Sequence, residues 1–260
     1  MTSIIKDCFS FLNNFADESG KILKKKFDES FKIDIKNDGS MVTEVDRMIE
    51  NLFLEKIKEE FSDHGVLGEE FGSYNKDSKF KWIIDPLDGT HSFIAGKPLF
   101  GTLICLMVEK VPTLGLIDIP ILKERWIGGK NLKVKKNKTL CKINQNKKKL
   151  KECIVSSTSL LMFNDEHSKV IKKIYEKVKF PVFGTDCYAY GLLLSGKIDL
   201  IIEANMRPWD YMAQVPLIEE AGGIITDWKG DSLNLESCGQ VIASQSKSSH
   251  EEALNYLSKI

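Results

Sequence analysis

A ten-residue segment, KWIIDPLDGT at 81–90, constrains the fold of this chain more than any other stretch. Its apolar start predicts a buried β-strand, and Pro86 ends that strand because proline has no N–H to donate to a sheet. The strand therefore finishes on the carboxylate of Asp85. A turn through Pro86 and Leu87 brings the Asp88 carboxylate and the Leu87 carbonyl to the same point. Oxygen ligands gathered in this way are typical of a site for a hard cation.

The next two residues of the segment suit an anion. Gly89 lets the backbone approach closely, and Thr90 can cap a following helix, so free N–H groups would face any anion that the cation holds. The same string also fits a plain turn whose carboxylates only cap the chain. A calcium loop is less favoured, because the alternating acidic pattern that ends in a distal glutamate is missing.

Composition limits the partners that the chain can have. Its 260 residues are enough for one large domain or for two lobes that share a cleft. Lys and Arg number 37, as do Asp and Glu, so no overall field recruits nucleic acid or an acidic membrane. The amino terminus is charged too early for a secretory signal, and no apolar run reaches the ~20 residues of a membrane span, so we expect a cytoplasmic protein. The six cysteines are scattered singly, which argues against zinc and disulfides.

Further acids stand at the ends of predicted elements. Thr43 and Asp46 form a capping-box pattern that opens a helix to about residue 61. Glu69 and Glu70 end a short apolar run, shortly before the strand of the central segment, where two strands can be neighbours. Asp210 lies in the first turn of another predicted helix. Each of these acids has a structural interpretation, as a cap or a solvated side chain, beside a functional one.

The hydrophobic pattern divides the chain near residue 150. Residues 131–151 are rich in lysine without aromatic residues, which favours a solvated hairpin over a nucleic-acid surface. Strands and helices alternate after 152, which predicts an α/β lobe at 151–260 behind an α+β lobe at 1–150 that carries most cation ligands. The other predicted elements are a helix at 3–27, an edge strand at 27–36, a turn at 37–40, strands at 100–108 and 114–119 joined by a turn at 110–112, strands at 153–157, 182–183, 199–203, 224–227 and 240–244, and helices at 165–177, 188–195, 208–221 and from 248.

Several motifs together resemble the inositol monophosphatase superfamily of magnesium-dependent, lithium-sensitive phosphatases. The matching stretches are GEE at 68–70, WIIDPLDGT at 82–90 with SF at 92–93, WD at 209–210 with Ala213, and EAGG at 220–223. Lys36, Val42, Thr43 and Asp46 fit the amino-terminal pattern of that superfamily, so the resemblance covers nearly the whole chain. It implies a layered α-β-α-β-α sandwich of the inositol monophosphatase and fructose-1,6-bisphosphatase type, usually a homodimer.

Within the superfamily the chain is most similar to the histidinol-phosphate phosphatase branch, through residues 92–104, 119–128, 186–193 and 225–228. Two positions depart from the branch: His91 stands where Lys is expected, and Trp209 where Tyr is often found. The resemblance implies hydrolysis of L-histidinol phosphate to L-histidinol and phosphate, in histidine biosynthesis. An inositol-1-monophosphatase, a sugar bisphosphatase or a 3'(2'),5'-bisphosphate nucleotidase would share every metal ligand, so these alternatives stay open. A phosphate-binding protein without activity is less favoured, because none of the implied acids is lost.

The resemblance also implies roles for individual residues. Two or three Mg²⁺ ions would be held by Glu69, Asp85, the Leu87 carbonyl, Asp88 and Asp210. Thr90, Asp46 and Glu69 would be catalytic, with Asp46 orienting Thr90 toward the attacking water. The amides of Gly89 and Thr90, helped by Lys36, would hold the phosphate.

Asp186 and Glu203 fall where the superfamily contacts the organic part of its substrate. An extra carboxylate at Asp186 suits a substrate amine, because charge-assisted hydrogen bonds are the stronger kind. The alternative is that Asp186 only caps the helix that begins at residue 188.

Overall fold

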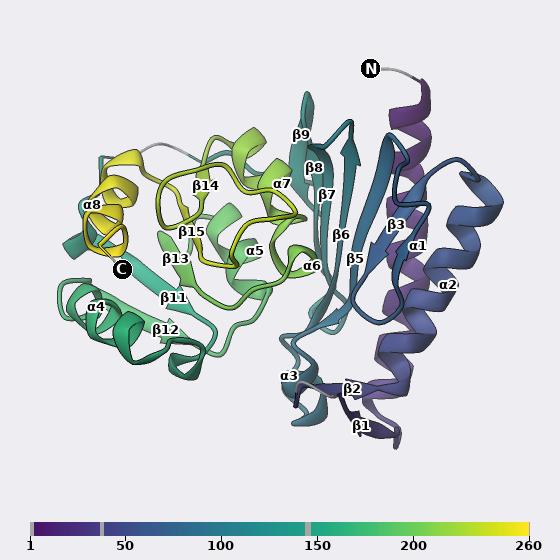
Figure 1. The fold of residues 1–260 in the computed structure, drawn as a ribbon, viewed down its shortest axis with the longest axis horizontal. Helices are drawn as coiled ribbons and strands as arrows, with labels where there is room; N and C mark the ends of the chain where they lie inside the picture. Colours follow the sequence, from purple (N-terminus) through teal and green to yellow (C-terminus); the bar gives the residue numbers. More distant parts are fainter. Residues whose placement is uncertain (1–2, 37–38, 144–146, 260) are drawn as a thin grey trace.

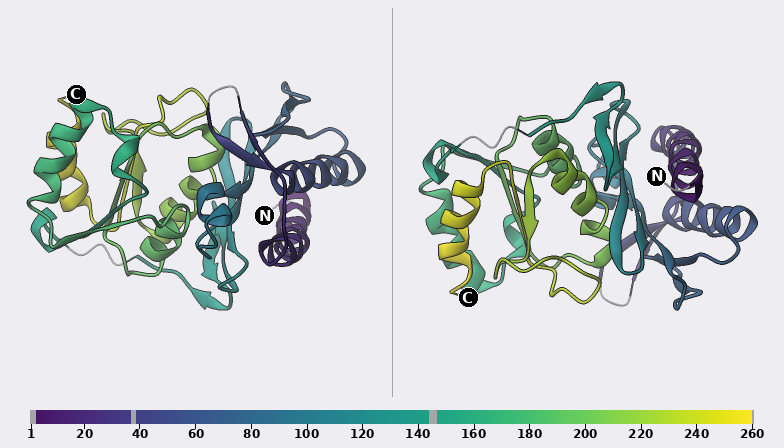
Figure 2. Two further views of the ribbon diagram at one scale, coloured as in Figure 1. Left: turned by 90° about the horizontal axis from the view of Figure 1, so that it is seen from below. Right: turned by 90° about the horizontal axis from the view of Figure 1, so that it is seen from above.

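Helices and sheets alternate in layers across the protein (Figure 1). The structure, a computed structural model, describes residues 3–36, 39–143 and 147–259. From one side to the other, the layers are α1 (Ser3–Phe27) and α2 (Glu44–Glu60), an eight-stranded sheet, α5 (Tyr188–Leu194), α6 (Pro208–Tyr211) and α7 (Gln214–Ala221), a five-stranded sheet, and α4 (Asp165–Tyr175) with α8 (Lys247–Leu257) (Figures 1 and 2). This order confirms the predicted α-β-α-β-α sandwich.

The larger sheet is built from β3 (Gly65–Gly68), β4 (Gly72–Tyr74), β5 (Phe80–Asp88), β6 (Gly101–Val108), β7 (Val111–Ile119), β8 (Glu124–Gly129), β9 (Leu132–Lys136) and β10 (Thr139–Leu140). Its order is β10-β9-β8-β7-β6-β5-β3-β4, and β3 and β5 are its one parallel pair among the described residues. Helices cover both faces of this sheet, which is why β5 and β6 are buried and apolar along most of their length. The parallel pairing places the carboxyl ends of β3 and β5 side by side, an arrangement that the sequence permits.

Aromatic side chains attach α1 and α2 to the larger sheet. Phe15 of α1 meets Phe53 of α2 with ring centroids 4.8 Å apart, and Phe11 lies 5.4 Å from Trp82 of β5. The start of α2 is fixed by the predicted capping box, in which the Thr43 amide donates to Asp46 Oδ2 at 2.8 Å. A small hairpin of β1 (Ile33–Ile35) and β2 (Met41–Thr43) precedes this helix.

The smaller sheet follows in the second half of the chain, with strand order β12-β11-β13-β15-β14. Its strands are β11 (Ile154–Ser157), β12 (Phe180–Phe183), β13 (Leu200–Glu203), β14 (Ile224–Thr226) and β15 (Val241–Ser244). Helices α5 and α7 share one hydrophobic cluster with both sheets, whose members include Leu217, Ile117 and Ile201. The strands of the larger sheet come before residue 150 in the sequence and those of the smaller sheet come after it, but the division of the chain into two lobes stays a prediction. Among the described helices, none has the length and apolar character that crossing a membrane requires.

The predicted end of the central strand is wrong. β5 does not stop at Pro86 but continues to Asp88. Pairing with β3 has already ended at Ile84, and on the other side the register with β6 shifts between Asp85 and Asp88. This bulge accommodates a residue without an N–H, and the Thr102 hydroxyl donates to the Pro86 carbonyl at 3.0 Å.

Three other predicted boundaries need correction. The helix expected at 208–221 is divided into α6 and α7, because Pro216 in the first turn of α7 has no N–H to donate to the Met212 carbonyl. Val111 and Pro112 belong to β7 and not to the preceding turn. The edge strand at 27–36 is reduced to β1, since α1 continues to Phe27. Parts of the predicted turn at 37–40 and hairpin at 131–151 lie outside the described residues.

Candidate active site

Three carboxylates meet where β5 ends. One oxygen atom each of Asp85, Asp88 and Asp210 lie within 4.8 Å of one another. The bulge in β5 turns Asp85 and Asp88 to the same point, and α6, which packs against β5, brings Asp210 from far along the chain. The structure therefore brings together three of the four acids that the sequence predicts as side-chain metal ligands.

Backbone amides hold each of these carboxylates in place. The Leu87 amide donates to Asp85 Oδ1 at 3.0 Å, and the Cys187 amide donates to Asp88 Oδ2 at 2.7 Å. The amide of Arg207 donates to Asp210 Oδ2 at 2.7 Å, as part of the cap of α6. Each carboxylate is thus oriented by the hydrogen bond that one of its oxygens accepts, and it keeps further lone pairs for a ligand.

The carboxylates of this cluster would be stabilised in their ionised form by a bound cation. Burial raises the pKa of Asp85 well above its ordinary value, and the neighbouring carboxylates of Glu69, Asp88 and Asp210 raise it further. Burial, followed by the charge of Asp186, raises the pKa of Asp88 to about 7. Acids this close together can be ionised together only when positive charge neutralises them. An all-oxygen set of this kind fits a hard divalent ion, so the residues present can hold a metal ion.

Glu69 lies beside the cluster but binds a lysine. Lys36 Nζ is 2.7 Å from Glu69 Oε1 and 2.6 Å from Glu70 Oε1. Burial lowers the pKa of Lys36, but its hydrogen bonds to the two glutamates outweigh that effect and the net shift is upward. Burial raises the pKa of Glu70 to about 7 in spite of Lys36. A role for Glu69 as a metal ligand, and for Lys36 at the phosphate, stays a prediction.

Glu50 is a supporting residue that sequence reasoning missed. Its carboxylate accepts the amides of Glu70 at 2.8 Å and of Phe71 at 2.9 Å, and so fixes the turn after β3. Gly68 makes room for it, since a Cβ there would lie 1.9 Å from Glu50 Oε1. The glycine before the paired glutamates was the only available signal.

Asp46 serves two structures at once. Its Oδ2 caps α2, whereas its Oδ1 faces the Thr90 hydroxyl at 3.4 Å. The Thr90 hydroxyl is also 3.0 Å from the Leu87 carbonyl. Burial raises the pKa of Asp46, which favours a carboxylate that can accept a proton. Asp46 therefore caps α2 and also contacts Thr90, and its catalytic role stays a prediction.

Gly89 forms the start of α3 (Thr90–Ile94). Its φ of 82° is in the left-handed region, which glycine adopts without strain. A Cβ there would lie 3.2 Å from the Phe100 Cα and 3.3 Å from Asp186. Glycine at this position thus lets the turn after β5 lie against Asp186 and Phe100.

A small cavity of about 150 Å³ opens beside Asp88 and Asp210. Asp186 lines it and accepts a hydrogen bond from the Ser92 hydroxyl at 2.5 Å. The start of α5 has no side-chain cap, so capping does not account for Asp186. The other polar residues that line this cavity are Thr158, Tyr190, Glu203 and Asn205.

Glu203 forms the buried wall of this cavity. It accepts the Thr158 amide at 3.0 Å, the Thr158 hydroxyl at 2.5 Å and the Tyr190 hydroxyl at 3.1 Å. Burial raises its pKa to about 7, the three hydrogen bonds oppose that shift, and the charge of Asp186 adds to it. Thr158 and Tyr190 were missed in the sequence, where neither stands out from an ordinary core or loop position.

Carboxylates gathered for a divalent ion, next to a small polar pocket, equip an enzyme to hydrolyse phosphate esters. The comparisons with known proteins agree with this class. The chain belongs to the inositol monophosphatase family, whose model matches residues 6–260. It is thus a phosphatase of that family.

Three phosphatases illustrate how similar the chain is to characterised members of the family. The chain is 42% identical over 254 residues to the chloroplastic bifunctional phosphatase IMPL2 of Arabidopsis thaliana, covering 94% of this chain and 73% of that protein. It is 31% identical over 229 residues to a histidinol-phosphatase of Chlorobaculum parvum, covering 88% of each. Among solved structures, an inositol monophosphatase from Zymomonas mobilis matches with a TM-score of 0.88 and 35% identity, covering 99% of this chain and 100% of that one.

Proposed function

We propose that this protein is a magnesium-dependent histidinol-phosphate phosphatase, which converts L-histidinol phosphate and water to L-histidinol and phosphate in histidine biosynthesis. The observation that carries the proposal is the pair of carboxylates, Asp186 and Glu203, in the cavity beside the acid cluster. A substrate with an amine gains charge-assisted hydrogen bonds there, whereas a neutral polyol does not. The similarity to a histidinol-phosphatase supports the same choice.

Asp186 is the better candidate for the ammonium group. Its carboxylate accepts one side-chain hydrogen bond, from Ser92, and a carboxylate has room for about four. Glu203 already accepts three hydrogen bonds from Thr158 and Tyr190. We therefore assign the substrate amine to Asp186 and the more buried end of the substrate to the wall formed by Glu203.

The ions would be held by Glu69, Asp85, the Leu87 carbonyl, Asp88 and Asp210. Two or three Mg²⁺ bound there would neutralise the phosphoryl oxygens and make a water molecule more acidic. Lys36 would add positive charge at the open side of the site.

Thr90 and Asp46 have the geometry to handle the proton of the attacking water. When the Thr90 hydroxyl donates to Asp46 Oδ1, its lone pairs are free to accept a proton from that water. The raised pKa of Asp46 makes it a suitable final acceptor. The amides of Gly89 and Thr90, at the start of α3, would orient the phosphate.

A substrate comparison tests the proposal. Phosphate release is measured with Mg²⁺ and with EDTA, on L-histidinol phosphate, inositol 1-phosphate and adenosine 3',5'-bisphosphate. We expect kcat/KM for L-histidinol phosphate to exceed the others at least about tenfold, the worth of one charge-assisted hydrogen bond. A preference for inositol 1-phosphate would refute L-histidinol phosphate as the substrate but would agree with membership of the family. Inositol monophosphatase activity is the second candidate function, because the chain is similar to the Zymomonas mobilis enzyme.

We also propose that the protein is a cytoplasmic homodimer. Leu160, Leu161, Phe180 and Phe183 are all exposed, Leu161 at 93%, and the two phenylalanines belong to β12 at the edge of the smaller sheet. Burial of such side chains against a second copy would be favourable. Light scattering after size exclusion tests this, and a monomer at micromolar concentration would contradict it.

A further inference from the structure

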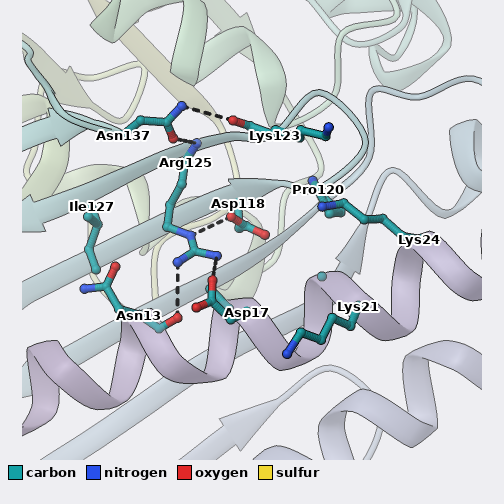
Figure 3. Close-up of a pocket in the computed structure, with 12 residues that line it drawn as sticks. Asn13, Asp17, Lys21, Lys24, Asp118, Pro120, Lys123, Arg125, Ile127 and Asn137 are labelled. Atoms are coloured by element: carbon teal, nitrogen blue, oxygen red, sulfur yellow. Dashed lines mark hydrogen bonds and ion pairs between the residues drawn. The ribbon is translucent and has the colours of Figure 1, made fainter.

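A second cleft lies against α1, on the face of the larger sheet away from the α5, α6 and α7 layer. Its volume is about 440 Å³. Figure 3 shows its walls: one face of α1 with Asn13, Asp17, Lys21 and Lys24, and opposite them the end of β7, the β7–β8 turn and the start of β8. No acid of the metal cluster lines this cleft.

The base of the cleft is held rigidly by Arg125. Its guanidinium donates to Asp118 Oδ1 at 2.6 Å, to Asp17 Oδ1 at 2.8 Å and to the Asn13 carbonyl at 3.1 Å, and so joins β8 to both β7 and α1 (Figure 3). Asp118 is buried, with 5% of its surface exposed. Gly20 keeps the floor open, because a Cβ there would lie 3.3 Å from Asp118 Oδ2.

The opposite wall is braced as well. Asn137 accepts the Arg125 amide at 3.0 Å and donates its side-chain N–H to the Lys123 carbonyl at 3.0 Å. These two bonds fix the β7–β8 turn, in which Lys123 has a φ of 56°. The Lys123 side chain therefore starts from a fixed point at the edge of the cleft.

The charges around the cleft do not balance. Lys21, Lys24, Lys123 and Arg125 line it together with only two carboxylates, an excess of two positive charges. Both carboxylates bind Arg125. Across the described ranges, no ion pair occupies the ammonium group of Lys21, Lys24 or Lys123.

We propose that this cleft binds a small phosphorylated metabolite as its dianion, at a site separate from the catalytic one. The excess charge matches a phosphomonoester, and the volume is that of a pocket for a small organic molecule. The three lysines surround one concave site, whereas binding to a nucleic-acid backbone calls for cations that track along a surface. Arg125 and Asp118 supply the fixed polar base, and the lysines supply the charge.

Inorganic phosphate is the probe for the test. The protein is kept metal-free with EDTA, because the acid cluster then repels phosphate and leaves the cleft as the cationic site. Phosphate is titrated at constant ionic strength while the backbone amide resonances of Gly20, Lys21 and Lys123 are followed by NMR, with sodium chloride as the reference anion. We expect saturable shifts with phosphate and none with chloride.

Two double variants complete the experiment. Lys21→Ala with Lys24→Ala should weaken phosphate binding about tenfold, from the loss of two charges near the ligand. Lys169→Ala with Lys173→Ala, exposed lysines on α4, removes the same charge and should leave binding unchanged. Equal effects of the two pairs, or shifts that never saturate, would mean general charge attraction and overturn the proposal. Because the assay needs neither metal nor turnover, its failure is distinguishable from a failure of the proposed activity.

Discussion

Replacing Asp186 with asparagine tests which side chain selects the substrate. Asparagine has the same size and can still accept the hydrogen bond that the Ser92 hydroxyl makes at 2.5 Å, so the wall of the cavity is preserved. The change removes one negative charge and the charge-assisted hydrogen bond to a substrate ammonium. Such bonds contribute about 1.5–3 kcal/mol, which corresponds to about tenfold to a hundredfold in kcat/KM.

The assay compares L-histidinol phosphate with p-nitrophenyl phosphate, which has no amine, at saturating Mg²⁺. We expect Asp186→Asn to lose about thirtyfold in kcat/KM on the first and less than about threefold on the second. Ser92→Ala is the matched control, because it removes the hydrogen bond to Asp186 and keeps the charge; it should affect the two substrates by similar, small factors. Equal losses on both substrates in Asp186→Asn would refute ammonium binding by Asp186.

The remaining predictions concern the support of the site and the stability of the fold. Gln214 Nε2 donates to the Asp210 carbonyl at 2.7 Å, so Gln214→Leu should weaken Mn²⁺ binding about fivefold, measured by electron paramagnetic resonance, with an unchanged circular dichroism spectrum. Gly68→Ala should lower the free energy of unfolding in urea by about 2–3 kcal/mol, because its Cβ would collide with Glu50. Burial lowers the pKa of His250 to about 4, so the unfolded chain binds its proton first as the pH falls, and the contribution of His250 to stability should fall by about 2 kcal/mol from pH 7 to pH 5. Because the buried acids with raised pKa values stabilise the fold over the same range, the test is the difference in unfolding free energy between the wild type and His250→Asn, which should shift by that amount in favour of the variant.

The sequence was most informative where the chemistry is local. The string from Asp85 to Thr90 predicts the turn, its two carboxylates and the helix that follows, all from neighbouring residues. It fails at Pro86, since the strand continues through a bulge that only the pairing with β6 explains. The break between α6 and α7, in contrast, has a local signal that the prediction passed over, because Pro216 cannot donate an N–H within a continuous helix.

Distance along the chain sets the other limit on prediction. Asp210 joins the cluster only because α6 packs on β5, and nothing in its own neighbourhood distinguishes it from a capping acid. Glu203 and Tyr190 reach one cavity from different elements, and their hydrogen bond belongs to the folded state alone. Resemblance to a family supplied Asp210 and Glu203 in advance, whereas Tyr190 came from the structure.

Asp46 and Asp210 show why a capping role and a functional role need not compete. In each, one carboxylate oxygen accepts a backbone amide at a helix start: Thr43 for Asp46 and Arg207 for Asp210. That bond fixes the side chain in one orientation before any ligand arrives: Asp46 Oδ1 faces Thr90, and the Asp210 carboxylate lies in the acid cluster. The capping hydrogen bond thus reduces the conformational entropy that the side chain would otherwise lose when a ligand binds. A capping pattern at a helix start next to other acids is therefore a reason to look for a site.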